Sequence, residues 1–141
     1  MSKASKRLAG ILMIILPTVA FGGTALLSML ISAESAYMDN PLRQNLFRAG
    51  HAHAGILLIL SLIILRYIDE THYKERTKRW IRSGVPITAI LLPVAFFFSV
   101  LNPDATEPNN LIYVAYVGFV ILTLTLVVTG IGLIYYNKKN A

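Results

Sequence analysis

Four long apolar stretches dominate this sequence and limit what it can fold into. They cover residues 8–31, 50–67, 83–101 and 111–136, and none of them contains an acidic residue. A helix needs about 20 apolar residues to cross the hydrocarbon core of a bilayer, where it must satisfy its own backbone hydrogen bonds. The sequence therefore predicts an all-α integral membrane protein, with residues 1–141 forming one membrane domain built as a four-helix bundle.

The composition supports this class and excludes several others. Hydrophobic residues make up 55% of the chain and charged residues only 14%, whereas a soluble domain carries about 25% charged residues. A disordered tail and an ordinary soluble enzyme are both excluded. The chain has no cysteine, so disulfides, thiolate metal sites and iron–sulfur clusters are excluded as well.

The charged residues are unevenly distributed on the two sides of the predicted spans. One side carries eleven basic and three acidic residues, whereas the other carries two basic and four acidic residues. The basic residues of the first side are Lys3, Lys6, Arg7, Arg66, Lys74, Arg76, Lys78, Arg79, Arg82, Lys138 and Lys139. The positive-inside rule places this side, and with it both termini, in the cytoplasm. The net charge of +6 therefore reflects topology and lipid headgroups, not nucleic acid, and the predicted location is the cell membrane.

Small residues recur at helical spacing in two of the spans. They are Ala20, Thr24, Ser28 and Ser32 in the first span, and Gly118, Thr125, Thr129, Gly130 and Gly132 in the fourth. Small side chains let membrane helices approach closely, so both sets predict helix–helix packing. Residues 42–47, between the first two spans, are expected to form a short interfacial helix.

Two histidines form the polar exception in the apolar spans. His51 and His53 lie in the segment FRAGHAHAG, residues 47–55, where the second predicted span begins. Ionisable groups inside a span are costly and often functional. The sidedness of the charges places both histidines within about one helical turn of the outer surface. They are either interfacial side chains bonded to their neighbours or ligands of a cofactor.

Helix geometry restricts how the two histidines can act together. Residues two apart are about 200° apart around an α-helix, so one ion can be held by both imidazoles only if the backbone is extended there. Alternatively, His51 shares a face with Gly55, and a flat haem lying over that glycine would have His51 as its axial ligand. No other span contains a histidine, so the haem would be five-coordinate, take a different sixth ligand, or bind in a dimer. Haem b and a divalent metal ion are the candidate cofactors.

Three further residues belong to this candidate site. Arg48 lies just before the histidines and is a candidate cofactor contact, with contact to lipid headgroups as the alternative. Glu34 and Asp39 lie in the preceding loop and are possible additional metal ligands, with simple solvation as the alternative. No catalytic residue is assigned, because neither Gly-x-Ser-x-Gly nor His-Glu-x-x-His occurs.

The histidine segment carries two resemblances. Residues 41–55, PLRQNLFRAGHAHAG, resemble a segment of small four-span bacterial membrane proteins, a resemblance that implies the same topology and brings no established activity. The His-x-His-x-Gly run is also similar to histidine-bearing helices of haem–copper oxidases and NnrS-like membrane proteins. Those families use more spans and more histidines than this chain has. The second resemblance therefore excludes a stand-alone oxidase and leaves open a relic or accessory haem binder.

These observations leave three hypotheses for the function. The first is a small membrane protein that binds haem, a metal ion or a quinone near the outer leaflet through His51 and His53, as an accessory or sensor component of a respiratory or redox system. The second is a cofactor-free structural or assembly subunit, either a homodimer or part of a larger membrane complex. The third is a small transporter or channel in which the histidines carry proton coupling. Under the first two, no stand-alone catalytic activity is expected.

Overall fold

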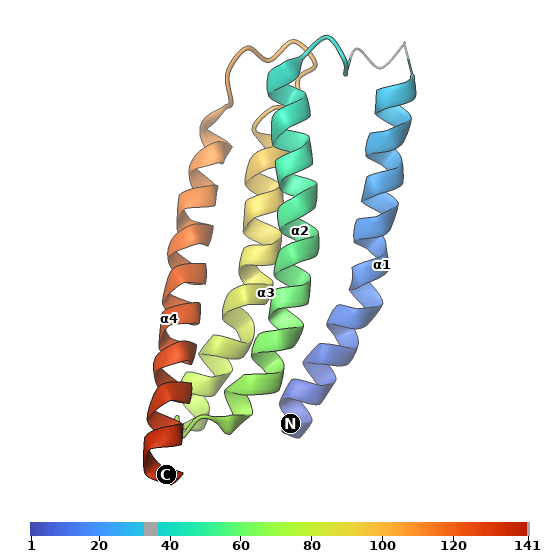
Figure 1. The fold of residues 1–141 in the computed structure, drawn as a ribbon. Coiled ribbons are helices and arrows are strands. Elements are labelled where there is room, and N and C mark those ends of the chain that lie inside the picture. The colour runs from blue at the N-terminus through green and yellow to red at the C-terminus, as the bar shows by residue number, and fades with distance from the viewer. Residues whose placement is uncertain (33–36, 141) are drawn as a thin grey trace.

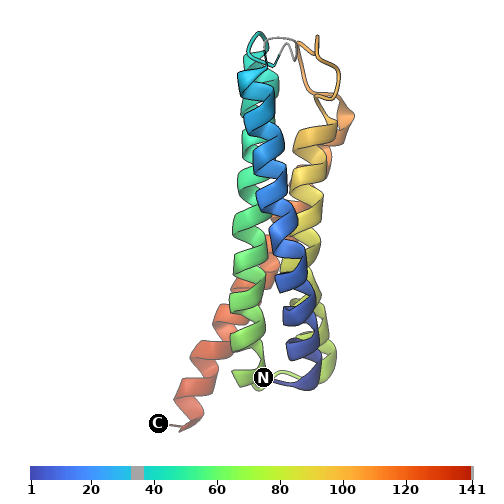
Figure 2. The same cartoon turned by 90° about the vertical axis from the view of Figure 1, so that its right-hand side faces the viewer.

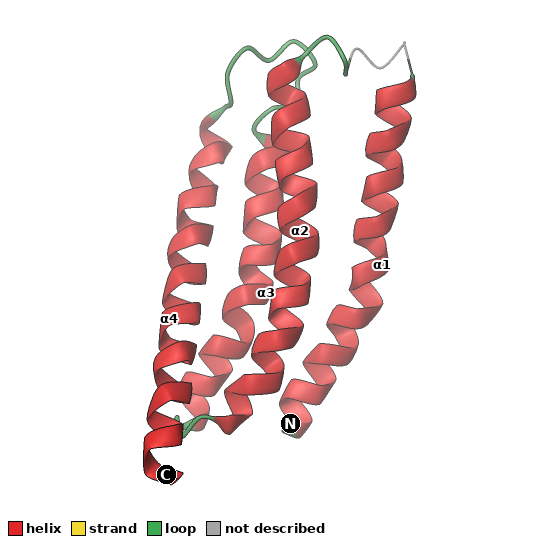
Figure 3. Ribbon diagram, viewed as in Figure 1, coloured by secondary structure: helices red, strands yellow, loops and turns green. Residues whose placement is uncertain are grey.

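The computed structural model describes residues 1–32 and 37–140, with side chains up to Tyr135. Its long helices are α1 (Lys3–Ile31), α2 (Pro41–Tyr67), α3 (Glu75–Phe98) and α4 (Val114–Asn140). Short 3-10 helices at Ile68–Glu70 and Asn110–Tyr113 precede α3 and α4. Every regular element in the described part of the chain is helical, as Figure 3 shows. The predicted all-α class with four long helices is confirmed.

Four helical segments are long and apolar enough to cross a membrane. They are Lys3–Ile31, Pro41–Glu70, Glu75–Phe98 and Asn110–Tyr135. The predicted apolar spans all lie within or next to these segments, but three of the helices begin earlier than the spans. Hydropathy indicates which part of a helix can lie in the lipid, whereas capping groups determine the residue at which the helix starts.

The start of α2 shows this most clearly. The side chain of Asn40 accepts a hydrogen bond from the backbone N–H of Arg43 at 3.0 Å, and Pro41 occupies the first helical turn. Proline is favoured there because it has no N–H to leave unpaired. Residues 42–47 are therefore the first turns of α2, and the prediction of a separate interfacial helix is wrong. His51 and His53 consequently lie three turns inside the helix, not at its mouth.

The helices are arranged so that α3 packs against both α2 and α4, while α1 packs mainly on α2 (Figures 1 and 2). Both chain termini lie at one end of the bundle, here called the terminal end, together with the turn between α2 and α3 (Figure 1). The opposite end, here called the loop end, carries residues 37–41 and 99–110. The side-chain amide of Asn40 links these two segments. It donates hydrogen bonds to the carbonyl oxygens of Pro103 and Ala105, at 2.8 and 2.9 Å.

The small residues of the first and fourth spans behave differently. In α4, Gly118 faces Leu92 of α3 and buried Thr125 lies against Gly84, so the predicted packing is confirmed at these two residues, whereas Gly130 has nothing within 4 Å of an added Cβ. In α1, however, Ala20, Thr24 and Ser28 are exposed. Other residues of α1, among them Leu12, Val19, Gly22 and Gly23, face the bundle instead. Within this chain a neighbouring row of α1 faces α2, so helix–helix packing through the exposed row stays a prediction for contact with another chain.

Candidate functional site

The imidazole of His51 points from α2 toward α1, where it meets two glycines. A Cβ atom placed on Gly23 would lie 3.2 Å from His51 Nε2, and one placed on Gly22 would lie 3.7 Å from His51 Nδ1. Any larger side chain at Gly23 would press on the ring. The glycine pair therefore makes room for the half-buried imidazole between the two helices.

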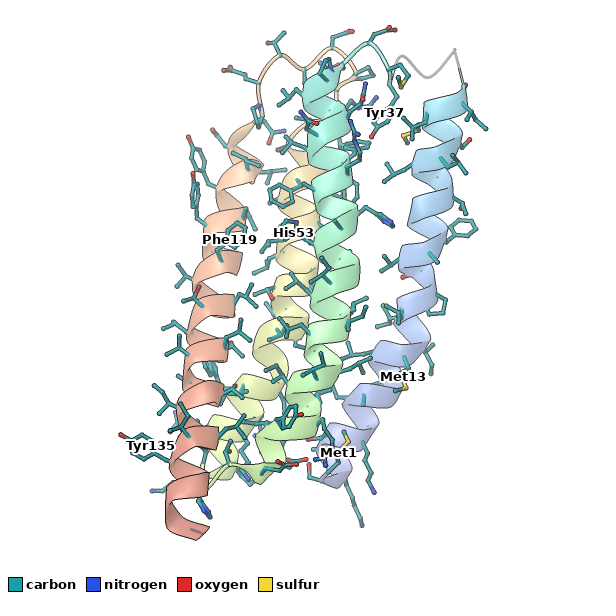
Figure 4. All side chains as sticks on the ribbon, in the orientation of Figure 1. Met1, Met13, Tyr37, His53, Phe119 and Tyr135 are labelled. Atoms are coloured by element: carbon teal, nitrogen blue, oxygen red, sulfur yellow. The ribbon has the colours of Figure 1, made fainter. Side chains whose placement is uncertain are left out.

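The imidazole of His53 points to a different part of the bundle. Its Nδ1 lies 2.7 Å from the carbonyl oxygen of Ala49, one turn earlier in α2. A carbonyl oxygen only accepts, so Nδ1 carries the proton and the lone pair of the neutral ring lies on Nε2. The ring is 5.2 Å from that of Phe96 in α3 and 6.1 Å from that of Phe119 in α4, measured between centroids. Figure 4 shows His53 on the side of α2 that faces α3 and α4.

The structure therefore does not bring the two histidines together. α2 is α-helical from Pro41 to Tyr67, so the extended backbone that would align both imidazoles on one ion is not present. The angle of about 200° between residues i and i+2 directs one ring to α1 and the other to α3 and α4. Among the described residues, no group of three or more histidine, aspartate, glutamate or cysteine side chains is close enough to hold a metal ion.

The other predicted site residues lie apart from both imidazoles. Gly55 is on the His51 face as expected, but a Cβ there would be 3.6 Å from Val19, so α1 covers this glycine. Arg48 is exposed, and its guanidinium bonds to the side chain of Gln44 at 3.0 Å. Asp39 is exposed at the loop end, roughly 15 Å along the helix axis from His51. Glu34 lies outside the described residues.

An apolar groove between α1, α2 and α3 begins one turn below His51. Its volume is about 370 Å³. Its lining includes Leu12, Thr18 and Val19 of α1, Ala54 and Leu58 of α2, and Ala89 and Pro93 of α3. Ala54 is three residues beyond His51, and Thr18 is four residues before Gly22. The groove thus runs from the middle of the bundle toward the imidazole without any charged side chain in its wall.

The His53 face has a different, aromatic character. α4 presents a hollow of about 310 Å³ lined by Tyr116, Phe119, Val120, Thr123 and Leu124. Phe119 belongs both to this hollow and to the surroundings of His53. The ring of Tyr116 also stacks on that of Tyr113, with centroids 6.2 Å apart. Sequence reasoning missed Phe96 and Phe119 as neighbours of His53, because the register between helices cannot be read from spacing within one helix.

A separate cluster of buried residues lies at the loop end. Tyr37 is fully buried against Phe47 and Val100, and the guanidinium of Arg43 lies 4.9 Å over the ring of Phe47. Burial raises the pKa of the Tyr37 phenol above its ordinary value, and nearby Arg48 and Arg43 offset only part of this rise. This cluster closes the loop end and does not reach the histidines.

A buried ionic cluster at the terminal end was not predicted from the sequence. The side chain of Arg82 is only 7% exposed and pairs with Asp69 at 2.7 Å and with Glu75 at 3.0 Å. Its Nε also donates to the hydroxyl of Ser5 at 2.9 Å. In the sequence, the cluster was indicated only by Arg82, a single arginine at the edge of an apolar stretch. An argument from topology counts this arginine only as one more positive charge. Here it joins α1, α3 and the turn before α3.

Comparison with known proteins adds no assignment to this geometry. No family model matches the chain, and neither the curated proteins nor the solved structures give a match. The function therefore has to be argued from the two histidine environments themselves.

Proposed function

We propose that the chain is a multi-pass protein of a bacterial cell membrane with both termini in the cytoplasm. The four long apolar helices support membrane insertion. The positive-inside rule supports the orientation, because eleven of the 13 basic residues belong to segments at the terminal end. In this orientation, the histidines lie in the half of the membrane nearer the outside.

We further propose that this protein binds haem, with His53 as the axial ligand, as an accessory or sensor component of a membrane redox system. The observation that carries the proposal is the hydrogen bond from His53 Nδ1 to the carbonyl oxygen of Ala49, at 2.7 Å. Histidines that ligate metals usually donate their second ring nitrogen to a carbonyl or carboxylate in this way. The bond fixes the ring and leaves Nε2 as the iron ligand.

The surroundings of His53 suit a flat apolar macrocycle better than those of His51. Phe96 and Phe119 place aromatic rings next to His53, and the exposed surface of α4 beside Phe119 carries a hollow lined by apolar and hydroxyl-bearing side chains. On the other face, Val19 covers Gly55, where a haem held by His51 would have to lie. Bound haem would supply one-electron or gas-binding chemistry at its iron. The protein residues would hold it, exclude water and set its environment.

The test is the absorption spectrum of the full-length protein purified from cells supplied with haem, together with metal analysis. Wild-type protein is expected to show a Soret band, and His53→Ala to lower haem occupancy more than about tenfold. His51→Ala is the matched control, only two residues away, and is expected to retain the band. Equal loss in both variants would contradict the assignment of the ligand. Colourless, metal-free wild-type protein would contradict haem binding and favour the cofactor-free subunit.

A second candidate function is quinone binding on the His51 face, and the groove is the observation that favours it. A quinone whose carbonyl oxygen contacts His51 would place its apolar tail in the groove, whose wall carries no charge. The test is binding of a short-chain quinone to protein in nanodiscs. Leu58→Trp, which fills the groove, and His51→Ala are each expected to weaken binding about tenfold, whereas His53→Ala leaves it unchanged. The reverse pattern would contradict this candidate.

A further inference from the structure

Burial along α1 is strongly uneven. Its two buried residues, Ser5 and Leu12, both lie before Pro17, and none lies between Pro17 and Ile31. In contrast, buried residues of α2 extend from Phe47 to Leu65, and those of α3 from Ile81 to Ala95. A segment with few buried contacts separates from the rest of a protein at low free-energy cost. In a bilayer this cost is lower still, because lipid replaces apolar contacts without a hydrophobic penalty.

The first half of α1 is held by the ionic cluster at the terminal end. Arg82 donates to the hydroxyls of Ser5 and Ser2, at 2.9 and 3.3 Å. The same arginine pairs with Asp69, which also accepts from the backbone N–H of Ser2 at 2.6 Å. These bonds connect α1 to α3 and to the turn before α3, and they involve nearly buried groups. This half of α1 is therefore fixed to the bundle.

The second half of α1 is held only by partial contacts. Gly22 and Gly23 lie against the His51 ring, and half-buried Leu26 and Met29 pack beside the loop-end cluster. Pro17 separates the two halves, and as a proline it leaves the carbonyl of Met13, one turn earlier, without its helical donor. Prolines inside helices are frequent sites of bending. Figure 1 shows α1 approaching α2 at the terminal end and standing further from it at the loop end.

We propose that the half of α1 after Pro17 is a lateral gate that swings away from α2, while the Arg82 cluster holds the first half in place. Opening would expose the His51 ring to the bilayer and widen the apolar groove, because Gly22 and Gly23 of α1 face the ring and Val19 forms part of the groove wall in the closed state. Hinged motion of one element about a fixed neighbour is a common way of admitting ligands. This inference does not depend on haem at His53.

The test uses pairs of spin labels in full-length protein in nanodiscs, which is direct because the chain has no native cysteine. Thr24→Cys with Ile56→Cys reports on the second half of α1, and Gly10→Cys with Ile63→Cys reports on the first half. All four positions are exposed. The Thr24–Ile56 pair is expected to show a second population longer by roughly 5 Å or more, and the Gly10–Ile63 pair a single narrow one. One narrow population for both pairs would overturn the gate.

Two variants locate the hinge and the anchor. Pro17→Ala restores the missing helical donor, so the longer population of the Thr24–Ile56 pair is expected to shrink at least about twofold. Arg82→Gln removes the ionic cluster, so the Gly10–Ile63 distribution is expected to broaden. If Pro17→Ala leaves the longer population unchanged, the hinge is not at Pro17 and the gate as described is overturned. If Arg82→Gln leaves the Gly10–Ile63 distribution narrow, the cluster is not the anchor.

Discussion

The two faces of α2 carry the same side chain in two unlike environments. On one face, His51 lies between helices against two glycines, beside an apolar groove. On the other face, His53 is fixed by a hydrogen bond to Ala49 and surrounded by the rings of Phe96 and Phe119. Two residues of separation are enough to make this difference, because they rotate a side chain about 200° around the helix. The two imidazoles therefore lie in two separate environments.

The two faces also differ in how firmly they are covered. The helix that covers His51, α1, has only two buried residues, whereas α3, which packs on the other side of α2, has nine. A site under a loosely packed helix suits a ligand that enters and leaves through the bilayer. A site between firmly packed helices suits a bound cofactor. Three predictions test this contrast, in order of decreasing expected effect.

The largest effect is expected at the anchor of α1. Arg82→Met would leave the nearly buried carboxylate of Asp69, only 14% exposed, without its partner. Breaking a buried ion pair in this way costs about 3–5 kcal/mol of the free energy of unfolding, because an uncompensated charge remains. The measurement is unfolding of the purified protein in a denaturing detergent, with circular dichroism as the signal.

Two further variants serve as controls for this prediction. Arg66 forms an ion pair with Glu70 in which both side chains are largely exposed, so Arg66→Gln is expected to cost no more than about 1 kcal/mol. Adding Asp69→Asn to Arg82→Met removes the orphaned charge and is expected to recover part of the loss. Equal losses of unfolding free energy in Arg66→Gln and Arg82→Met would show that burial of the Arg82 cluster does not increase its contribution to stability.

A smaller effect is expected where α4 packs on α3, on the His53 side. A Cβ added to Gly84 would overlap the side chain of Thr125, whose own Cβ would be only 3.1 Å away. Gly84→Ala is therefore expected to lower the free energy of unfolding by about 1–3 kcal/mol. Gly10 in α1 has nothing within 4 Å of such a Cβ. Gly10→Ala is expected to be neutral or slightly stabilising, since alanine favours helix by about 1 kcal/mol. If both variants change the free energy of unfolding in the same direction, the result would argue against tight α3–α4 packing.

The smallest effect, and the most specific one, concerns the rings themselves. Gly23→Ala presses on His51, and Phe119→Ala removes one aromatic neighbour of His53, worth about 0.5–1.5 kcal/mol. Histidine ¹⁵N spectra are expected to show the His51 signals moving only in Gly23→Ala and the His53 signals only in Phe119→Ala. In wild-type protein, the spectrum is expected to show a proton on Nδ1 of His53, the nitrogen that donates to Ala49. If either variant moves both histidines equally, the two faces are not independent.

Much of the fold follows from local features of the chain. The apolar stretches predicted four helices, because lipid leaves a spanning segment no alternative to internal hydrogen bonds. Helix ends were predicted less well, since Asn40 and Pro41 start α2 nine residues before Gly50, the first residue of the predicted span. The divergence of His51 and His53 follows from the period of the α-helix alone. Their position within α2 was misjudged only because the start of α2 was misjudged, and their depth in the membrane stays a prediction.

What each histidine contacts required the tertiary structure. The sequence by itself determined the helical class, the uneven distribution of charge and the separation of the two imidazoles, because all three depend on composition or on the geometry of one helix. Only the packing of helices decided that Gly22 and Gly23 face His51, that Phe96 and Phe119 face His53, and that Arg82 joins Ser5 to Asp69. These contacts depend on the register and rotation of one helix against another, which the many similar apolar residues of membrane helices leave undetermined.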